Sequence, residues 1–286
     1  MTAQIDSIVD AHVHWWDVEK NPWYEFIRSV DETEGTNLHR NYLPADYRRS
    51  IGDAHVDKVV HVSAVVGTQR YLDELRWLDG VAEDSGFEVR CVGSVDPTLD
   101  AAELEAHLDA QLEGGRLRGI RVLGGLEPEG EAARTLADWL IQHDLVFDLV
   151  CRPDTLERWT RFVADRPRLR VVLEHTGWPL GVDQASYRAW ERSLTDFAHG
   201  TAAAVKISGL AMVTREIGVA AIRPWIECCL DRFGWDRVLF ASNFPVDGVG
   251  GSYADLLHVF DEVLKEASSE QRQEFFAGNA ERIYDL

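Results

Sequence analysis

The chain has 286 residues, of which 45% are hydrophobic and 27% are charged, values typical of a globular protein with one large core. Its 49 acidic side chains exceed its 29 basic ones and give a net charge of −20, which argues against binding to nucleic acids or anionic membranes. The four cysteines form no Cys-x-x-Cys pair, no apolar run reaches the ~18 residues of a membrane span, and the N-terminus shows no signal-peptide pattern. We therefore expect a cytoplasmic protein with a small-molecule substrate and leave homo-oligomerisation open.

Short β-rich runs alternate with amphipathic helical stretches along the chain. The candidate strands cover residues 7–14, 56–66, 87–96, 117–124, 145–153, 170–177, 203–211 and 237–245. Helical periodicity lies between them, for example over 100–113 and over 215–233, where Pro224 is a candidate break.

Eight such β-then-α units predict a single (β/α)8 barrel over residues 1–286. An open doubly wound sheet is the competing architecture, but no Gly-x-Gly-x-x-Gly turn follows the early strands. Segment 15–55 is too long and too aromatic for a plain strand-to-helix connection. We expect this segment to cover part of the barrel mouth.

The first strand ends on "VDAHVHWWD", which places His12 and His14 two residues apart. Alternate residues of a strand share one face, so both imidazoles are expected to point the same way. They are either metal ligands or partly buried structural histidines, because His-x-His is a short and common pattern.

The active site of such a barrel lies at the carboxyl ends of its strands. The polar residues expected there are His12, His14, Arg121, Asp148, Arg152, His175, Ser208, Asn243 and Asp247. Three histidines from two strands therefore meet at one mouth. Three nitrogens with one oxygen suit a zinc-like divalent ion that keeps a position open for water or substrate.

Several segments resemble the amidohydrolase superfamily, specifically amidohydrolase family 2. The segments are "VDAHVHWWD", "VVLEHTGWP", "AVKISGL", "LFASNFPVD" and "FFAGNAERIYDL", and they follow the family's order nearly end to end. Within the family the chain looks most like the sugar-lactone and 2-pyrone-4,6-dicarboxylate lactonase group. The resemblance implies a barrel, site histidines at His12, His14 and His175, a zinc ion in some members and none in others, and a strand-8 aspartate that takes a proton from water.

The strand-8 position departs from that pattern, because it is Asn243 in this chain. An amide is not a general base near neutral pH and offers only a neutral oxygen as a ligand. Asp247 can reach back and act as the base, or a metal-bound hydroxide can make a strong base unnecessary. In the third account, the hydrolytic reaction has been lost.

The remaining candidates concern substrate binding. They are Arg121, Arg152, Trp15, Trp16, Trp178 and Asp148, with Trp23 and Tyr24 as further aromatics near the mouth. A guanidinium can grip a carboxylate or a lactone carbonyl, and aromatic faces suit a sugar ring or a flat pyrone. Arg121 is equally compatible with an internal salt bridge to Glu174 or Asp148, and packing is the ordinary role of at least half of the aromatics. Lys206 is interpreted as an ion-paired structural residue.

These observations favour a lactonase that opens a small sugar-derived or pyrone-type lactone with a divalent metal, or with histidine and aspartate alone. The catalytic residues expected are His175, Asp247 and Asn243, and the metal ligands are His12, His14 and His175. A metal-dependent decarboxylase of an unsaturated or aromatic acid is the alternative within the resembled family. A binding protein without chemistry is the third hypothesis.

Overall fold

The computed structural model describes residues 7–66 and 69–286 and contains one eight-stranded parallel sheet in the order β1 to β8. The strands are β1 (Ile8–Val13), β2 (Val56–Val62), β3 (Glu88–Ser94), β4 (Leu117–Arg121), β5 (Val146–Leu149), β6 (Arg170–Leu173), β7 (Ala204–Ile207) and β8 (Val238–Phe240). Asn243 N donates to His12 O at 2.8 Å and His14 N donates to Phe244 O at 2.9 Å, so the segment after β8 returns to β1. The predicted (β/α)8 barrel is confirmed.

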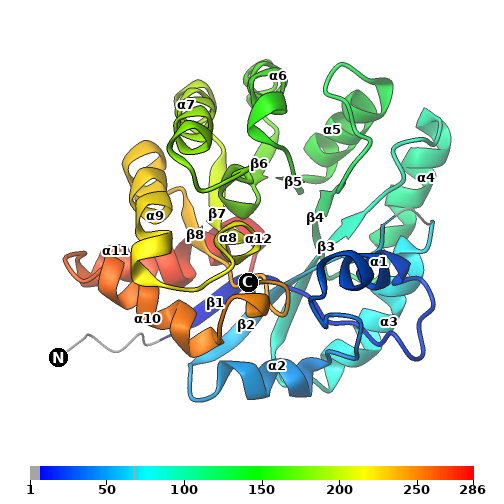
Figure 1. The fold of residues 1–286 in the computed structure, drawn as a ribbon. Helices are drawn as coiled ribbons and strands as arrows, with labels where there is room; N and C mark the ends of the chain where they lie inside the picture. The colour runs from blue at the N-terminus through cyan, green and yellow to red at the C-terminus, as the bar shows by residue number, and fades with distance from the viewer. Residues whose placement is uncertain (1–6, 67–68) are drawn as a thin grey trace.

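Helices surround the strands, as Figure 1 shows. They are α1 (Glu25–Glu34), α2 (Pro44–Ile51), α3 (Tyr71–Glu83), α4 (Ala101–Gln111), α5 (Glu131–His143), α6 (Pro153–Ala164), α7 (Gln184–Gly200), α8 (Leu210–Thr214), α9 (Val219–Phe233), α10 (Tyr253–Val263), α11 (Ser269–Gln273) and α12 (Asn279–Tyr284). Single turns lie at η1 (His175–Gly177), η2 (Asp247–Val249) and η3 (Glu274–Gly278).

Local sequence explains where individual helices begin and which face they bury. Asp100 caps α4 by accepting from Glu103 N at 2.9 Å, and Leu104 and Leu108 bury one face of the helix, as the periodicity predicts. The helix expected over 215–233 begins at Val219 and continues through Pro224, which lies early in α9. Pro224 is the sixth residue of α9 and lacks the N–H that would donate to Ala220 O, yet the helix continues to Phe233, so the predicted break does not occur.

The barrel interior is filled by small and branched side chains. A buried cluster contains Val9, Ala11, Val60, Val62, Val92, Val146, Val172, Ala204, Leu239 and Ala241, with Ala277, Ala280 and Tyr284 from the C-terminal segment. The strands thus pack a solid core, and the chain's last helix closes its lower end. The opposite end, where the strands finish, is therefore the end at which a ligand is expected to enter.

Two buried acidic residues hold the inside of the barrel in register. Asp10 of β1 accepts from Tyr47 Oη and Ser242 N, both at 2.8 Å, and so ties β1 to the segment after β8. Asp148 of β5 accepts from Lys206 Nζ and from Tyr284 Oη. Lys206 is therefore ion-paired in the barrel, which agrees with its structural interpretation.

Segment 15–55 forms α1 and α2 together with irregular chain. In Figure 1, α1 and α8 both lie in front of the ring of strands. Arg215, at the end of α8, donates from Nη2 to Oε2 of Glu34 in α1 at 2.8 Å. The two short helices thus meet across the barrel mouth. No helix within residues 7–66 or 69–286 is both long enough and apolar enough to cross a membrane.

Candidate active site

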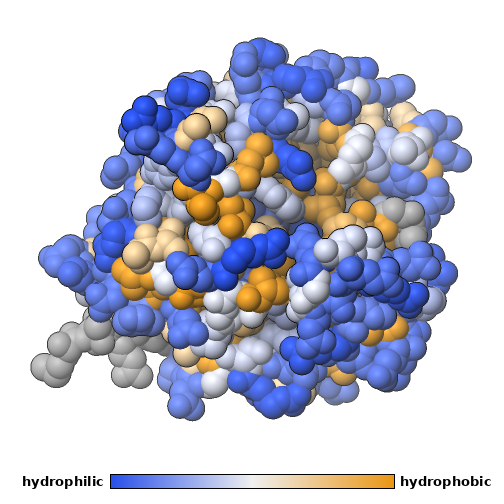
Figure 2. Space-filling model, viewed as in Figure 1, coloured by the Kyte–Doolittle hydropathy of each residue, from blue (hydrophilic) through white to orange (hydrophobic). Residues whose placement is uncertain are grey.

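A cavity of about 300 Å³ opens at the carboxyl ends of the strands. His14, His175, Arg121 and Asn243 line its inner end, whereas residues of α1, α8 and η2 line its outer part. Figure 2 shows hydrophobic side chains around the hollow on this face of the molecule. The size suits a small ligand, since ligand pockets usually begin at about 300 Å³.

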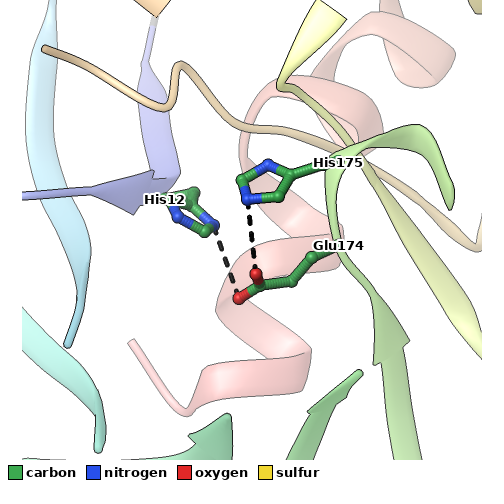
Figure 3. A group of neighbouring side chains, drawn as sticks. All are labelled: His12, Glu174 and His175. Carbon is green, nitrogen blue, oxygen red and sulfur yellow. Dashed lines mark ion pairs between the residues drawn. The ribbon is translucent and has the colours of Figure 1, made fainter. Parts of the chain in front are cut away.

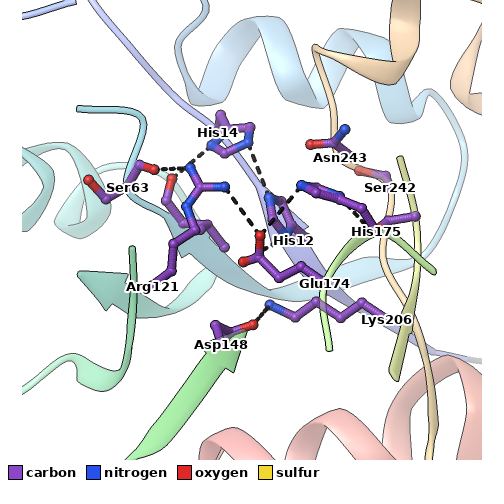
Figure 4. A network of polar contacts seen from close by, with 12 residues as sticks. His12, His14, Ser63, Arg121, Asp148, Glu174, His175, Lys206, Ser242 and Asn243 are labelled. Carbon is purple, nitrogen blue, oxygen red and sulfur yellow. Dashed lines mark hydrogen bonds and ion pairs between the residues drawn. The ribbon is translucent and has the colours of Figure 1, made fainter. Parts of the chain in front are cut away.

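His12 and His14 come together at the end of β1, and both are buried. The Nε2 atoms of the two rings lie 3.2 Å apart. His14 Nδ1 lies 2.8 Å from Val62 O, a carbonyl that can only accept, so Nδ1 carries the proton and Nε2 holds a free electron pair. The sequence pattern correctly placed both rings at one point, as Figure 4 shows.

Glu174 lies between the histidines at the end of β6. Its Oε1 is 3.6 Å from His12 Nδ1 and its Oε2 is 3.4 Å from His175 Nε2 (Figure 3). Arg121 Nη1 donates to the same Oε2 at 3.3 Å, and Nη2 donates to Ser63 O. Arg121 therefore makes the salt bridge that was one of its two interpretations, while it also lines the cavity.

His175 is held in an uncommon backbone conformation. Its φ of 51° lies in the left-handed region, as do the φ angles of Thr176 and Trp178. Its Nδ1 is 3.2 Å from Ser208 Oγ, and a Cβ atom at Gly209 would lie 2.7 Å from His175 Cβ. Glycine at position 209 therefore makes room for the ring, and strained residues of this kind gather at functional sites.

Asn243 also has a positive φ, of 56°, and its Nδ2 donates to Asp247 Oδ1 at 3.0 Å. Because the amide nitrogen is directed to Asp247, the amide oxygen is free to face the cavity, and in Figure 4 it is on the side of His14. Asp247 itself is buried and does not line the cavity. The pair is close together, as expected, but the amide and not the carboxyl reaches the site.

Burial keeps the site histidines neutral. It lowers the pKa of His12, His14 and His175 well below the usual range. The positive charge of Arg121 lowers all three pKa values further, and that of Lys206 lowers those of His12 and His175. Burial also raises the pKa of Glu174 to about 7 against the opposing effect of Arg121, and that of Asp247 to about 7 against its hydrogen bonds. Neutral imidazoles have the free electron pairs that metal binding and base catalysis require.

The donor set fits a divalent ion. Nitrogens about 2.0–2.1 Å from a tetrahedral zinc lie roughly 3.3 Å apart, close to the 3.2 Å between His12 Nε2 and His14 Nε2. His12 Nδ1 and Glu174 Oε1 are both buried without a hydrogen-bond partner among the described residues, and they face each other. A histidine that bound an ion through Nε2 would carry its proton on Nδ1 and donate it to this carboxylate. His12, Glu174 and His175 also place ligand atoms within 4.8 Å of one another.

The remaining predicted residues divide between the cavity and the core. Trp16, Trp178 and Arg152 line the cavity. Trp15 does not, because it is fully buried against Tyr47, His61 and Phe87. Asp148 does not either, since its carboxylate is used by Lys206 and Tyr284 inside the barrel. The expectation that Trp15 and Asp148 bind substrate is therefore replaced by packing and ion-pairing roles.

The sequence did not identify Glu174 as a central residue of the site. The sequence predicts it only as a possible partner of Arg121, whereas in the structure it contacts Arg121, His12 and His175 together. Its position immediately before His175, at the end of an apolar strand, was the available signal. The apolar side chains of α1 that line the cavity were also not identified, because segment 15–55 showed no clear periodicity.

These features define a class: a parallel barrel with a histidine-rich site at the carboxyl ends of its strands. The sequence model of the amidohydrolase family matches residues 9–286. The chain belongs to this family, as its motifs indicated.

Individual relatives span almost the whole chain. The uncharacterized protein y4mH of Sinorhizobium fredii is 30% identical, over 97% of this chain and 98% of its own length. An L-fucono-1,5-lactonase of Burkholderia ambifaria is 26% identical, over 86% of this chain and 83% of its own. The crystal structure of an amidohydrolase from Burkholderia multivorans with bound zinc has a TM-score of 0.82 and 25% identity, and it covers 98% of this chain and 99% of its own.

Proposed function

We propose that this protein is a hydrolase that opens a small cyclic ester in the cavity. The observation that carries the proposal is the group of three neutral histidines that meets beside the cavity's inner end, with Glu174 in contact with His12 and His175. The lactonase name of a relative and the zinc bound by another family member support it. The cavity volume suits a substrate of this size.

His12, His14 and His175 would hold a divalent ion, and Glu174 would fix the rings of His12 and His175. When bound, such an ion supplies a nucleophile at neutral pH by lowering the pKa of its water, and it polarises the ester carbonyl. Asn243 orients the attacking water through its amide oxygen, while Asp247 holds the amide by accepting from Nδ2. The water oxygen adds to the ring carbonyl, the ring C–O bond breaks, and the ring oxygen leaves with the proton as a hydroxyl group.

Metal content and lactone hydrolysis test this proposal together. We expect about one divalent ion per chain in protein purified without a tag or chelator, and ring opening above background for a panel containing an aldonolactone, a pyrone lactone and an alkyl δ-lactone. His14→Ala should remove the ion and lower turnover by about 10²–10⁴-fold. His199→Ala, which changes an exposed histidine of α7, should do neither.

A folded, metal-loaded protein that opens none of these lactones would sink the proposal. Release of carbon dioxide from an aromatic carboxylic acid under the same conditions would instead establish the decarboxylase alternative. Ligand binding that changes in His14→Ala, with no turnover in either protein, would establish a binding protein.

A further inference from the structure

The outer part of the cavity differs in chemistry from its inner end. Its walls are formed by Phe26, Ile27 and Val30 of α1, Met212 and Val213 of α8, and Val249 of η2. Apart from the methionine sulfur, a weak acceptor, these side chains offer no hydrogen-bonding group. Ile27 and Val30 are three residues apart and therefore share the helix face that looks into the cavity.

Three polar side chains of the outer cavity, Glu34, Thr36 and Arg215, each make one contact with the protein. Glu34 and Arg215 pair with each other at 2.8 Å. The hydroxyl of Thr36 donates to Asp31 Oδ1 at 2.9 Å. These side chains line the cavity, and each of the three has one polar contact within the protein.

Two of the aromatic and cationic side chains on the cavity wall keep a donor free for a ligand. Trp16 stacks beside His14, but its Nε1–H donates to Arg40 O at 2.7 Å, so the ring turns its carbon atoms to the cavity. Of the three arginines on the cavity wall, Arg121 and Arg215 pair with glutamates, whereas Arg152 has no ion pair with another described residue. The guanidinium of Arg152 and the indole N–H of Trp178, which make no side-chain hydrogen bond to another described residue, are therefore the donors available to a ligand in the cavity.

A polyhydroxylated ring would be poorly matched to such walls. Each of its hydroxyl groups exchanges water for a partner on binding, and a hydroxyl that meets only carbon loses that partner. An apolar ring loses nothing and gains burial. We infer that, given the proposed hydrolysis of cyclic esters, the substrate is a lactone with an alkyl or otherwise apolar body, selected by the wall that α1 adds to the cavity.

A matched pair of ligands tests the inference. L-fucono-1,5-lactone, the compound that gives the relative its name, and δ-hexalactone share a six-membered ring with one methyl group, and they differ by three ring hydroxyls. Their lactam analogues, in which N–H replaces the ring oxygen, resist hydrolysis and report binding alone. We expect the lactam without hydroxyls to bind at least about 100-fold more tightly, the discrimination typical of one hydroxyl in an apolar pocket.

Val30→Thr places a hydroxyl on the α1 wall with almost no change of shape. It should reduce the ratio of the dissociation constants of the two lactams. Val81→Thr makes the same change in α3, on a half-buried residue outside the cavity, and should leave the ratio as it is. Equal or tighter binding of the hydroxylated lactam would overturn the inference. If Val30→Thr left the ratio of the two lactam dissociation constants unchanged, the inference that α1 selects apolar ligands would be overturned.

Turnover of the two lactones, relative to their spontaneous hydrolysis, separates this inference from the proposed function. If neither ring opens while the lactam ratio holds, cyclic-ester hydrolysis is wrong and the apolar selectivity of the cavity stands. If both rings open but the hydroxylated lactam binds as well as its partner, hydrolysis stands and the apolar substrate class is wrong.

Discussion

The inner and outer ends of the cavity are built from different parts of the molecule. At the inner end, His14 and His175 are only 4% and 3% exposed, and backbone groups of neighbouring strands and buried polar partners fix them. At the outer end, Phe26 is 41% exposed, and α1 is joined to α8 by an ion pair at the surface. The ends of the strands therefore hold the site histidines, whereas the outer wall of the cavity comes from α1, α8 and η2.

This comparison predicts that substitutions that crowd the residues of the inner end lower both stability and turnover. Gly209→Ala adds a Cβ atom 2.7 Å from His175 Cβ, at a φ of 71° that disfavours alanine. We expect the free energy of unfolding to fall by about 1–3 kcal/mol and turnover to fall with it, because His175 must move. Urea denaturation and lactone hydrolysis measure the two effects.

Gly80→Ala is the matched control, because Gly80 lies inside helix α3 and an added Cβ there meets no atom within 4 Å. It should stabilise the protein by about 0.5–1 kcal/mol. If Gly209→Ala were as stable and active as this control, the inner end of the cavity would tolerate the displacement of His175, and the prediction that its packing is rigid would be wrong.

A smaller, pH-dependent effect is expected at Asn243. Asn243→Asp puts a second carboxyl group 3.0 Å from Asp247 Oδ1, where burial already raises the pKa of Asp247 to about 7. Two adjacent carboxyls cannot both ionise readily, so one folded-state pKa rises further above its unfolded value near 3.9. The folded state then binds more protons than the unfolded state, and stability falls as pH rises through this range, by about 1.4 kcal/mol for each pKa unit gained.

Unfolding in urea at about pH 5.5 and about pH 8.5 checks the sign. The free energy of unfolding of the variant should be closest to that of the native protein at the lower pH and should be clearly smaller at the higher pH. A deficit that is equal at both pH values would mean that the two carboxyls do not interact.

The smallest effect is expected at the outer end. Glu34→Gln removes the charge from a pair whose side chains are 45% and 58% exposed, so the free energy of unfolding should change by no more than about 0.5 kcal/mol. Hydrogen exchange should become faster in α1 and stay unchanged in β1. Glu157→Gln, which removes an exposed pair within α6, should leave exchange in α1 unaltered. Slower turnover with unchanged hydrogen exchange in α1 would contradict the view that the surface ion pair holds α1 in place independently of the barrel.

The fold followed from the sequence because alternating periodicity is a local property. All eight predicted strands are present, and each ends earlier than predicted: the strand expected over 170–177, for example, ends at Leu173. The last residues of that range leave the sheet and carry Glu174 and His175 into the site. Apolar character continues beyond the strand ends, so composition alone cannot mark where the ladder stops.

The candidate site was partly predictable for the same reason. His12 and His14 are neighbours along one strand, and strand ends of a barrel must meet, so their approach to His175 needed no knowledge of contacts. Trp15 and Asp148 were misplaced because their partners lie far away in the chain. Trp15 packs against Phe87, and Asp148 is bonded by Tyr284 of the last helix.

The sequence by itself determined the barrel, the amidohydrolase motifs and the histidine cluster, because spacing along a strand decides which side chains share a face. Only the tertiary structure decided that Glu174 contacts Arg121 and two site histidines, and that Asn243 rather than Asp247 reaches the cavity. It also decided that apolar side chains of α1 line the outer part of the cavity. Each of these depends on packing between segments that are distant in the chain, and no local pattern encodes the direction in which such side chains finally point.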